Sequence, residues 1–307
     1  MIRRKRFRLK LNSGTLVLGE RTLVMGVLNV TPDSFSDGGK FFDVKRAVEQ
    51  ALVMERAGAD LLDIGGESTR PGSARISAKE ELARVLPVLQ ALRGRVKIPV
   101  SIDTQKSEVA VAALDAGAEL INDISGLKSA PRIAEVAADR HVPLILMHMR
   151  GEPRTMQVGP FARDVVKDVL RGLRESVAIA RNAGVAKSQI VLDPGIGFGK
   201  SYVQNYELLQ KLPQLAKLGY PLLVGTSRKG FLGATLARED KPAPPEERIW
   251  GTAATVTASI LNGAHIVRVH DVAEMVQVAR VADCLVDAKL APKNETQSRR
   301  GDSEKCR

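Results

Sequence analysis

Side chains that could bind a charged or polar small molecule stand at the ends of short apolar runs in this chain. They are Asn29, Asp103, Asn122, Asp123, His148, Asp193, Lys229, Arg268 and His270. A single polar residue at a strand end is usually a helix cap or a turn former. The repetition favours one shared site, because the parallel strands of a closed barrel all end at the same opening. Carboxylate, amide and cationic groups gathered there could together recognise a polar ligand.

Two polar loops rich in Pro, Gly and hydroxyl residues follow the first two apolar runs. Residues 30–41 follow Asn29, and residues 65–76 include Thr69 and Arg70. Loops of this length between a strand and its helix are usually functional or disordered. Because several other strand ends also carry polar groups, we expect both loops to belong to the same site.

From residue 23 onward, short continuous apolar runs alternate with helical patterns. Continuous apolar runs are typical of parallel strands that are covered on both faces. About eight such strand and helix units favour an α/β fold of the (β/α)8 TIM barrel type over a doubly wound sheet. Predicted strands cover residues 23–28, 61–64, 100–103, 120–123, 144–148, 190–193, 222–224 and 266–269, and predicted helices cover residues 44–57, 78–92, 107–116, 130–138, 162–183, 205–217, 246–262 and 272–287.

The two ends of the chain differ from this pattern. Residues 7–19 alternate apolar and polar around an Asn-Ser-Gly turn, which predicts an N-terminal β-hairpin ahead of the barrel. The sequence turns polar after Ala288, which predicts a disordered C-terminal tail over residues 288–307. We therefore expect residues 1–287 to form a single domain.

The composition disfavours several classes of protein. Hydrophobic residues make up 44% of the 307, and no apolar run approaches the length of a membrane span. The basic N-terminal segment has no apolar stretch behind it, so we expect no secretory signal. The only cysteines, Cys284 and Cys306, argue against a disulfide framework and favour a reducing cytoplasm. The net charge of +11 comes with no nucleic-acid-binding signature, so we expect no nucleic-acid or membrane partner.

Several segments resemble the dihydropteroate synthase family, the folate-pathway members of the pterin-binding barrels. These are NVTPDSFSDGG (29–39), GGESTRPGS (65–73), SIDT (101–104), INDISG (121–126), LDPGIGF (192–198), SRKGF (227–231) and RVHDV (268–272). Jointly they are far more specific than one short motif. The resemblance implies an enzyme that joins 6-hydroxymethyl-7,8-dihydropterin diphosphate to p-aminobenzoate, releasing diphosphate and forming 7,8-dihydropteroate with magnesium present.

The resemblance also implies how the pterin is bound. Asp193, Asn122 and Lys229 would read its polar edge, with Asp103 near the other side of the ring. A carboxylate, an amide and an ammonium group match the N–H donors and the carbonyl of that edge. The implied catalytic residues are Asp103, Lys229 and Arg268, with Asp103 stabilising the pterin cation that forms as diphosphate leaves. We assign no general base, because an arylamine nitrogen is already a nucleophile.

For the diphosphate, the resemblance implies that Arg268 supplies a bidentate fork and His270 a nearby donor. Thr69 and Arg70 belong to one of the two polar loops, which would close over the anion and exclude water. Asn29 is the implied ligand of Mg²⁺, an ion that keeps waters and takes substrate phosphates rather than needing a protein cage. We therefore expect weak magnesium binding without diphosphate.

Two other features of the strand ends have structural interpretations. His148 is expected to be a hydrogen-bonded structural residue, and alternation places Met147 and Met149 on the opposite face of the strand. The glycines of residues 193–200 lack the Gly-Lys-Ser/Thr end of a nucleotide-binding loop. A turn that shapes the pterin slot around Phe198 explains them better.

Gly230 stands directly after Lys229, where many members of the family carry Ser or Arg. Because glycine offers no hydroxyl, we expect main-chain N–H groups near Gly230 and Phe231 to hold the carboxylate of p-aminobenzoate at the start of a helix. Ser68 or Thr69 would assist. The alternative is a turn glycine without this role.

Two other functions remain open. A corrinoid-linked methyltransferase uses the same pterin residues but needs no diphosphate clamp, and the motifs at 29–33, 68–71 and 227–229 argue against it. A catalytically silent paralogue would bind a pterin or a partner only. The family commonly dimerises through late barrel helices, so we expect a homodimer that uses the helix at 246–262, whose small residues include Ala253, Ala254, Val256 and Ala258.

Overall fold

The computed structural model describes residues 4–31, 39–69, 72–151, 155–156, 158–159 and 161–292 of the chain. Arg70, parts of the two polar loops and most of the segment 288–307 lie outside these residues. The predictions that the two loops close over an anion therefore remain predictions.

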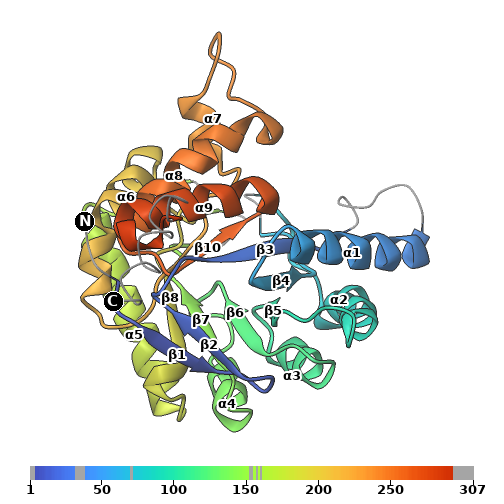
Figure 1. Cartoon of the computed structure of the whole chain (residues 1–307). Helices are drawn as coiled ribbons and strands as arrows, with labels where there is room; N and C mark the ends of the chain where they lie inside the picture. Colours follow the sequence, from blue (N-terminus) through green and yellow to red (C-terminus); the bar gives the residue numbers. More distant parts are fainter. Residues whose placement is uncertain are drawn as a thin grey trace, which may run out of the picture.

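Eight parallel strands form a barrel with helices on its outside (Figure 1). Neighbouring strands pair in the order β8-β7-β6-β5-β4-β3-β10-β9, and a bridge between Leu192 and Leu222 joins the two ends of the sheet. The strands are β3 (Leu23–Asn29), β4 (Leu61–Gly65), β5 (Val100–Asp103), β6 (Leu120–Asp123), β7 (Leu144–Met147), β8 (Ile190–Asp193), β9 (Leu223–Val224) and β10 (Ile266–Val269). The predicted TIM barrel is confirmed.

The connecting helices lie on the outside of the barrel (Figure 1), because each carries apolar side chains that pack in the same core as the outer faces of the strands. They are α1 (Gly39–Arg56), α2 (Ala78–Leu92), α3 (Ser107–Asp115), α4 (Arg132–Asp139), α5 (Val165–Asn182), α6 (Tyr202–Ala216), α7 (Gly230–Thr235), α8 (Ile249–Leu261) and α9 (Val272–Val286). Short 3-10 turns lie at η2 (Lys187–Gln189), η3 (Pro245–Arg248) and η4 (Ala288–Leu290).

Most predicted bounds agree with the structure within a few residues, and the differences have local causes. Helix α6 begins at Tyr202 rather than at 205, because Ser201 and Gln204 form a capping box there. The helix predicted at 246–262 starts as the 3-10 turn η3 and becomes α-helical only at Ile249. The helix expected near Gly230 is α7, which has six residues.

The predicted hairpin closes the amino-terminal end of the barrel. Strands β1 (Phe7–Lys10) and β2 (Thr15–Leu18) are antiparallel, and Leu9 and Leu18 are fully buried against residues at the starts of the barrel strands, such as Leu23 and Leu61. Burying each leucine contributes about 1.5–3 kcal/mol. The Gln189 side chain adds two hydrogen bonds to the backbone of Lys10. This end of the barrel is filled, so a site must lie at the other end.

The C-terminal segment is partly ordered where a disordered tail was predicted. Ala288–Leu290 form the turn η4, because the Asp287 side chain accepts a hydrogen bond from the Lys289 backbone N–H. The rest of the predicted tail lies outside the described residues from 293 onward. Among the helices that the structure describes, none combines the length and apolar character that a bilayer span requires.

Candidate active site

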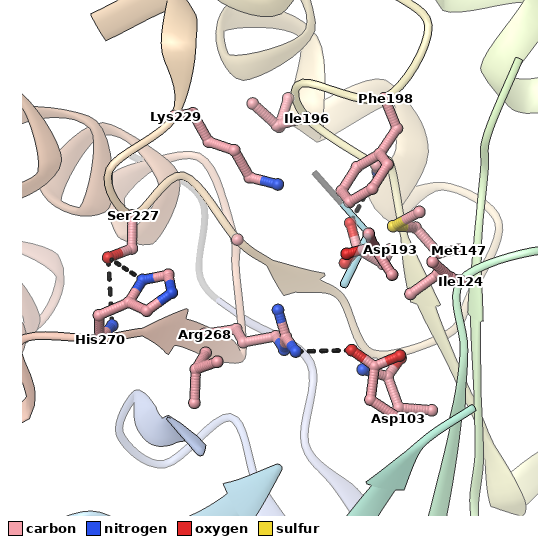
Figure 2. Close-up of a pocket in the computed structure, with 15 residues that line it drawn as sticks. Asp103, Ile124, Met147, Asp193, Ile196, Phe198, Ser227, Lys229, Arg268 and His270 are labelled. Carbon is pink, nitrogen blue, oxygen red and sulfur yellow. Dashed lines mark hydrogen bonds and ion pairs between the residues drawn. The ribbon is translucent and has the colours of Figure 1, made fainter. Parts of the chain in front are cut away.

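The carboxyl ends of the barrel strands surround a narrow pocket (Figure 2). Of the predicted site residues, it is lined by Thr69, Asp103, Asn122, Asp193, Phe198, Lys229, Arg268 and His270. The pocket adjoins a wider cleft of about 1000 Å³, which Asn29, Ser68 and Gly230 also line. The structure thus brings together every predicted site residue except Arg70, which lies outside the described residues.

Arg268 bonds to two carboxylates, one that lines the pocket and one that is fully buried outside its lining. Its Nη2 donates to Asp103 Oδ2 at 2.7 Å (Figure 2), and its Nε donates to Asp63 Oδ2 at 2.6 Å. Burial alone would lower the pKa of Arg268, but Asp63 and Asp103 raise it. Part of the guanidinium is therefore bonded to these two acids, and a bidentate contact of Arg268 with a diphosphate stays a prediction for its remaining N–H groups.

Asp63 is a site residue to which the sequence assigned no role. It is fully buried on β4, and its Oδ2 accepts from both Arg268 Nε and Asn122 Nδ2, the latter at 2.8 Å. Because Nδ2 of Asn122 is directed to Asp63, the amide presents its Oδ1 as an acceptor for a ligand. The sequence feature that could have identified Asp63 is an acid inside the apolar run Leu61–Gly65, because a buried carboxylate requires partners.

Burial raises the pKa of the Asp103 carboxyl, and the Arg268 guanidinium opposes that rise. Asp63, Glu81 and Asp123 also raise it, because they place further negative charge near the pocket. Asp103 therefore depends on Arg268 for its charge. A positive charge that formed on a ligand beside Asp103 would likewise stabilise its carboxylate against the negative charge of these acids.

Asp193 at the end of β8 and Lys229 at the start of α7 both line the pocket. Burial raises the pKa of Asp193 to about 6, while the Gly195 N–H and the charges of Lys229, Arg268 and Lys200 lower it. Burial lowers the pKa of Lys229 to about 8. Both groups are charged between these two values.

Phe198 forms a wall of the pocket, as predicted. The Lys229 ammonium lies 4.0 Å from the centre of its ring, a cation–π contact that aims the lysine into the pocket (Figure 2). Gly197 makes this approach possible: its backbone has φ +84°, and a Cβ there would press against the Lys229 side chain. The glycine-rich loop therefore shapes a slot, as the sequence predicts.

His270 and Ser227 form a pair at the edge of the pocket. Ser227 Oγ accepts from the His270 backbone N–H at 3.1 Å and lies 3.0 Å from His270 Nδ1. The Ser227 hydroxyl can then donate its hydrogen to Nδ1. The neutral ring therefore carries its own N–H at Nε2. Burial, together with nearby positive charges, lowers the pKa of His270 to about 3, so the ring is a neutral donor. Ser227 was given no role by the sequence beyond its place in the SRKGF segment.

The predicted Mg²⁺ ion would find few protein ligands among the described residues. Within the described residues there is no group of three or more His, Cys, Asp or Glu side chains with metal-binding geometry. Asn29 lies at the carboxyl end of β3 and lines the wider cleft, so one amide oxygen is at hand. That donor set fits a Mg²⁺ ion only if waters and a ligand phosphate complete its shell.

His148 lies away from the pocket, in agreement with the structural interpretation. Its ring packs against helix α5, where a Cβ at Gly172 would come within 2.6 Å of it. Met147, one residue earlier, lines the pocket and packs with Phe198 in a separate small cluster. The alternation along β7 that separates these side chains is as predicted.

Comparisons with known proteins agree with this geometry. A family model described as "Pterin binding enzyme" matches residues 25–270. The dihydropteroate synthase of Synechocystis sp. is 52% identical over 267 residues, which are 87% of this chain and 91% of that protein.

Solved structures give the same result. The dihydropteroate synthase of Xanthomonas albilineans with 4-aminobenzoic acid has a TM-score of 0.84 at 43% identity, covering 94% of this chain and 100% of that one. The same enzyme in complex with 7,8-dihydropteroate has a TM-score of 0.80 at 41% identity, covering 93% and 100%. On this evidence, the chain belongs to the pterin-binding enzyme family, among the dihydropteroate synthases.

Proposed function

We propose that this chain makes 7,8-dihydropteroate in folate biosynthesis by joining p-aminobenzoate to 6-hydroxymethyl-7,8-dihydropterin diphosphate, with release of diphosphate. This proposal rests mainly on the pocket. It holds hydrogen-bond acceptors and a donor that match the polar edge of a pterin, and it opens into a wider cleft. The relatives with the same fold are dihydropteroate synthases.

The pterin edge is read by three groups of complementary character. Asp193 as a carboxylate and Asn122 through Oδ1 accept from the N–H groups of the ring, and the Lys229 ammonium donates to its carbonyl. Phe198 covers the ring in the slot. The burial of Asp193 and Asn122 supports this assignment, because each makes stronger interactions away from water.

The diphosphate is held at the mouth of the pocket. Arg268 contributes the N–H groups that Asp63 and Asp103 leave available, and His270 donates through Nε2. Thr69, which lines both the pocket and the cleft, adds a hydroxyl. We retain Arg70 as a further anion ligand on the basis of the sequence.

Asn29 would hold a magnesium ion together with the diphosphate. When bound, the ion supplies neutralisation of the charge on the leaving group. Because Asn29 offers a single neutral oxygen, the ion and the diphosphate should bind together rather than separately.

The reaction begins with breakage of the C–O bond that joins the pterin methylene to the diphosphate. The bonding electron pair leaves with the diphosphate, and positive charge spreads into the pterin. Asp103, paired with Arg268, faces this charge and stabilises it. The amine of p-aminobenzoate then attacks the methylene carbon and loses a proton, which completes the new C–N bond.

The homodimer and the cytoplasmic location are further parts of the proposal. Large apolar side chains are exposed on α8 and α9, among them Trp250, Val281 and Leu285. These exposed side chains support a subunit contact. Val256, one of the residues expected in that contact, is buried in the core of the chain itself. The low cysteine content supports a reducing compartment.

The proposal is tested by incubating the purified chain with dihydropterin diphosphate, p-aminobenzoate and Mg²⁺ and assaying for 7,8-dihydropteroate by mass spectrometry. Product that depends on all three supports it. A silent paralogue would bind the pterin and release no product. A methyltransferase would act only when a methyl donor and a corrinoid acceptor replaced the arylamine.

Asp103→Asn should lower kcat on the order of a hundredfold or more, the scale seen when one preorganised electrostatic group is removed. Substrate binding should change much less, because the charge that Asp103 stabilises appears only as diphosphate leaves. Steady-state kinetics measure both values, and Asp115→Asn on the surface of α3 is the matched control. A raised KM with normal kcat would reduce Asp103 to a binding residue.

The pH profile of kcat/KM for the pterin substrate should be bell-shaped. Activity should fall as Asp193 gains a proton below its pKa of about 6, and again as Lys229 loses one above its pKa of about 8. Because the substrates also titrate, variants are needed to show which residue causes each limb of the profile. Asp193→Asn should remove the acidic limb, and Lys229→Met should remove the alkaline limb. Limbs that persist in both variants would refute the assignment.

Gly230→Pro should raise the KM for p-aminobenzoate selectively, because it removes one N–H from the start of α7. The position accepts proline in the first turn of a helix. Gly230→Ala is the control, since a Cβ there would meet no atom within 4 Å. Gly230 and Phe231 line the wider cleft with Ser68 and Thr69, which supports this site for the carboxylate. An unchanged KM in a folded proline variant would move the carboxylate elsewhere.

A further inference from the structure

Lys200 is a buried charge that the proposed reaction does not use. It ends the loop of residues 193–200, which joins β8 to α6 and contributes Asp193 and Phe198 to the pocket. Only 1% of its surface is exposed, and it does not line the narrow pocket. A buried ammonium group is unfavourable unless hydrogen bonds satisfy it, so its partners indicate what the fold uses it for.

The Lys200 ammonium has three acceptors. Nζ donates to the carbonyl oxygens of Phe198 and His148 at 2.9 and 3.0 Å, and it lies 3.1 Å from His148 Nδ1. An ammonium carries three N–H groups, so all three have a partner only when Lys200 is charged and Nδ1 is unprotonated. Burial lowers the pKa of His148 to about 2, which keeps the ring neutral. Its other nitrogen, Nε2, lies 3.7 Å from Asp168 Oδ2.

His148 holds both ends of the loop. Its backbone N–H donates to the Asp193 carbonyl at 2.9 Å, and its carbonyl accepts from Lys200. Gly195 passes so close that a Cβ there would overlap the His148 carbonyl oxygen. The Gly195 N–H in turn donates to Asp193 Oδ1 at 2.7 Å. The loop is therefore wrapped around one residue, with Lys200 as its closing contact.

The same ammonium acts on Asp193 through its charge. Lys200, Lys229 and Arg268 are the positive groups that lower the pKa of Asp193 against the effect of burial. Burial, together with the charges of Lys128 and Lys229, lowers the pKa of Lys200 to about 7, whereas Asp193 and Asp168 favour its charged form. Lys200 thus acts on Asp193 from a buried position outside the narrow pocket, at the border of the wider cleft.

We propose that Lys200 is a positioning residue for the pterin site, whose ammonium closes the loop of residues 193–200 around His148 and holds Asp193 and Phe198 in place. This inference deepens the proposed function and rests on it. The hydrogen bond to the Phe198 carbonyl fixes the wall of the slot. The hydrogen bonds to His148 fix the strand end to which the Asp193 carbonyl is bonded.

The test compares the wild type with Lys200→Met, which removes the charge and keeps the length of the side chain. The Kd for dihydropterin diphosphate, measured by calorimetry, should rise on the order of 10- to 100-fold, the scale expected when a binding group is misplaced by about 1 Å. The acidic midpoint of pterin binding should move to higher pH, because Asp193 loses one of its neighbouring positive charges. Backbone N–H groups of residues 193–200 should exchange faster with deuterium in the free protein.

Lys211→Met is the matched control, because Lys211 is exposed on α6 just beyond the same loop. Lys200→Gln is used if the methionine variant does not fold, since its amide is neutral yet can still donate to a carbonyl. An unchanged Kd and midpoint in a folded variant would overturn the proposal. A loss of affinity that is equal at every pH, with an unmoved midpoint and unchanged exchange, would overturn it too, because it would assign only a general packing role.

Failure of the proposed function would look different. In that case the wild type itself would not bind the pterin. The exchange rates of the loop in the free protein would then decide whether Lys200 closes it.

Discussion

The contact of Arg268 with Asp63 and Asp103 is the interaction on which the site depends. Three charged groups from strands β10, β4 and β5 meet at the pocket, where Arg268 and Asp103 line it and Asp63 is fully buried. Each carboxylate needs the guanidinium, because an isolated buried charge is far less stable than a paired one. The guanidinium in turn fixes Asp63, and Asp63 fixes the amide of Asn122. One arginine on β10 therefore orients groups on three other strands.

This network also explains how the pocket would accommodate both the pterin ring and the diphosphate of the proposed reaction. Its negative members lie deep in the barrel, next to Asp193, whereas Lys229 and the outer part of Arg268 face the mouth. A pterin edge that donates hydrogen bonds is suited to the acidic floor, and a diphosphate is suited to the basic mouth. The hairpin that fills the opposite end of the barrel leaves this opening as the place where the strand ends are accessible.

Much of this arrangement could be predicted from the sequence, because strand-end residues of a parallel barrel must share one opening. The apolar runs predicted the strands, and the polar residues that follow them predicted Asp103, Asn122, Asp193 and Arg268 as neighbours. The partners of these residues could not be predicted. Asp63 sits inside an apolar run and Lys200 follows a glycine-rich loop, so only side-chain directions reveal what they contact. The hydrogen bonds of Arg268 to Asp63 and Asp103 could not be predicted for the same reason.

The most direct test of this account is a double-mutant cycle on the free energy of unfolding, measured in urea at neutral pH with Asp63→Asn, Arg268→Met and the double variant. Arg268→Met should destabilise the fold by about 3–5 kcal/mol, because it leaves buried carboxylates without their partner. The double variant should be less destabilised than the sum of the two single variants, with a coupling of about 0.5–3 kcal/mol. Effects that add within about 0.5 kcal/mol would contradict the claim that this contact organises the site.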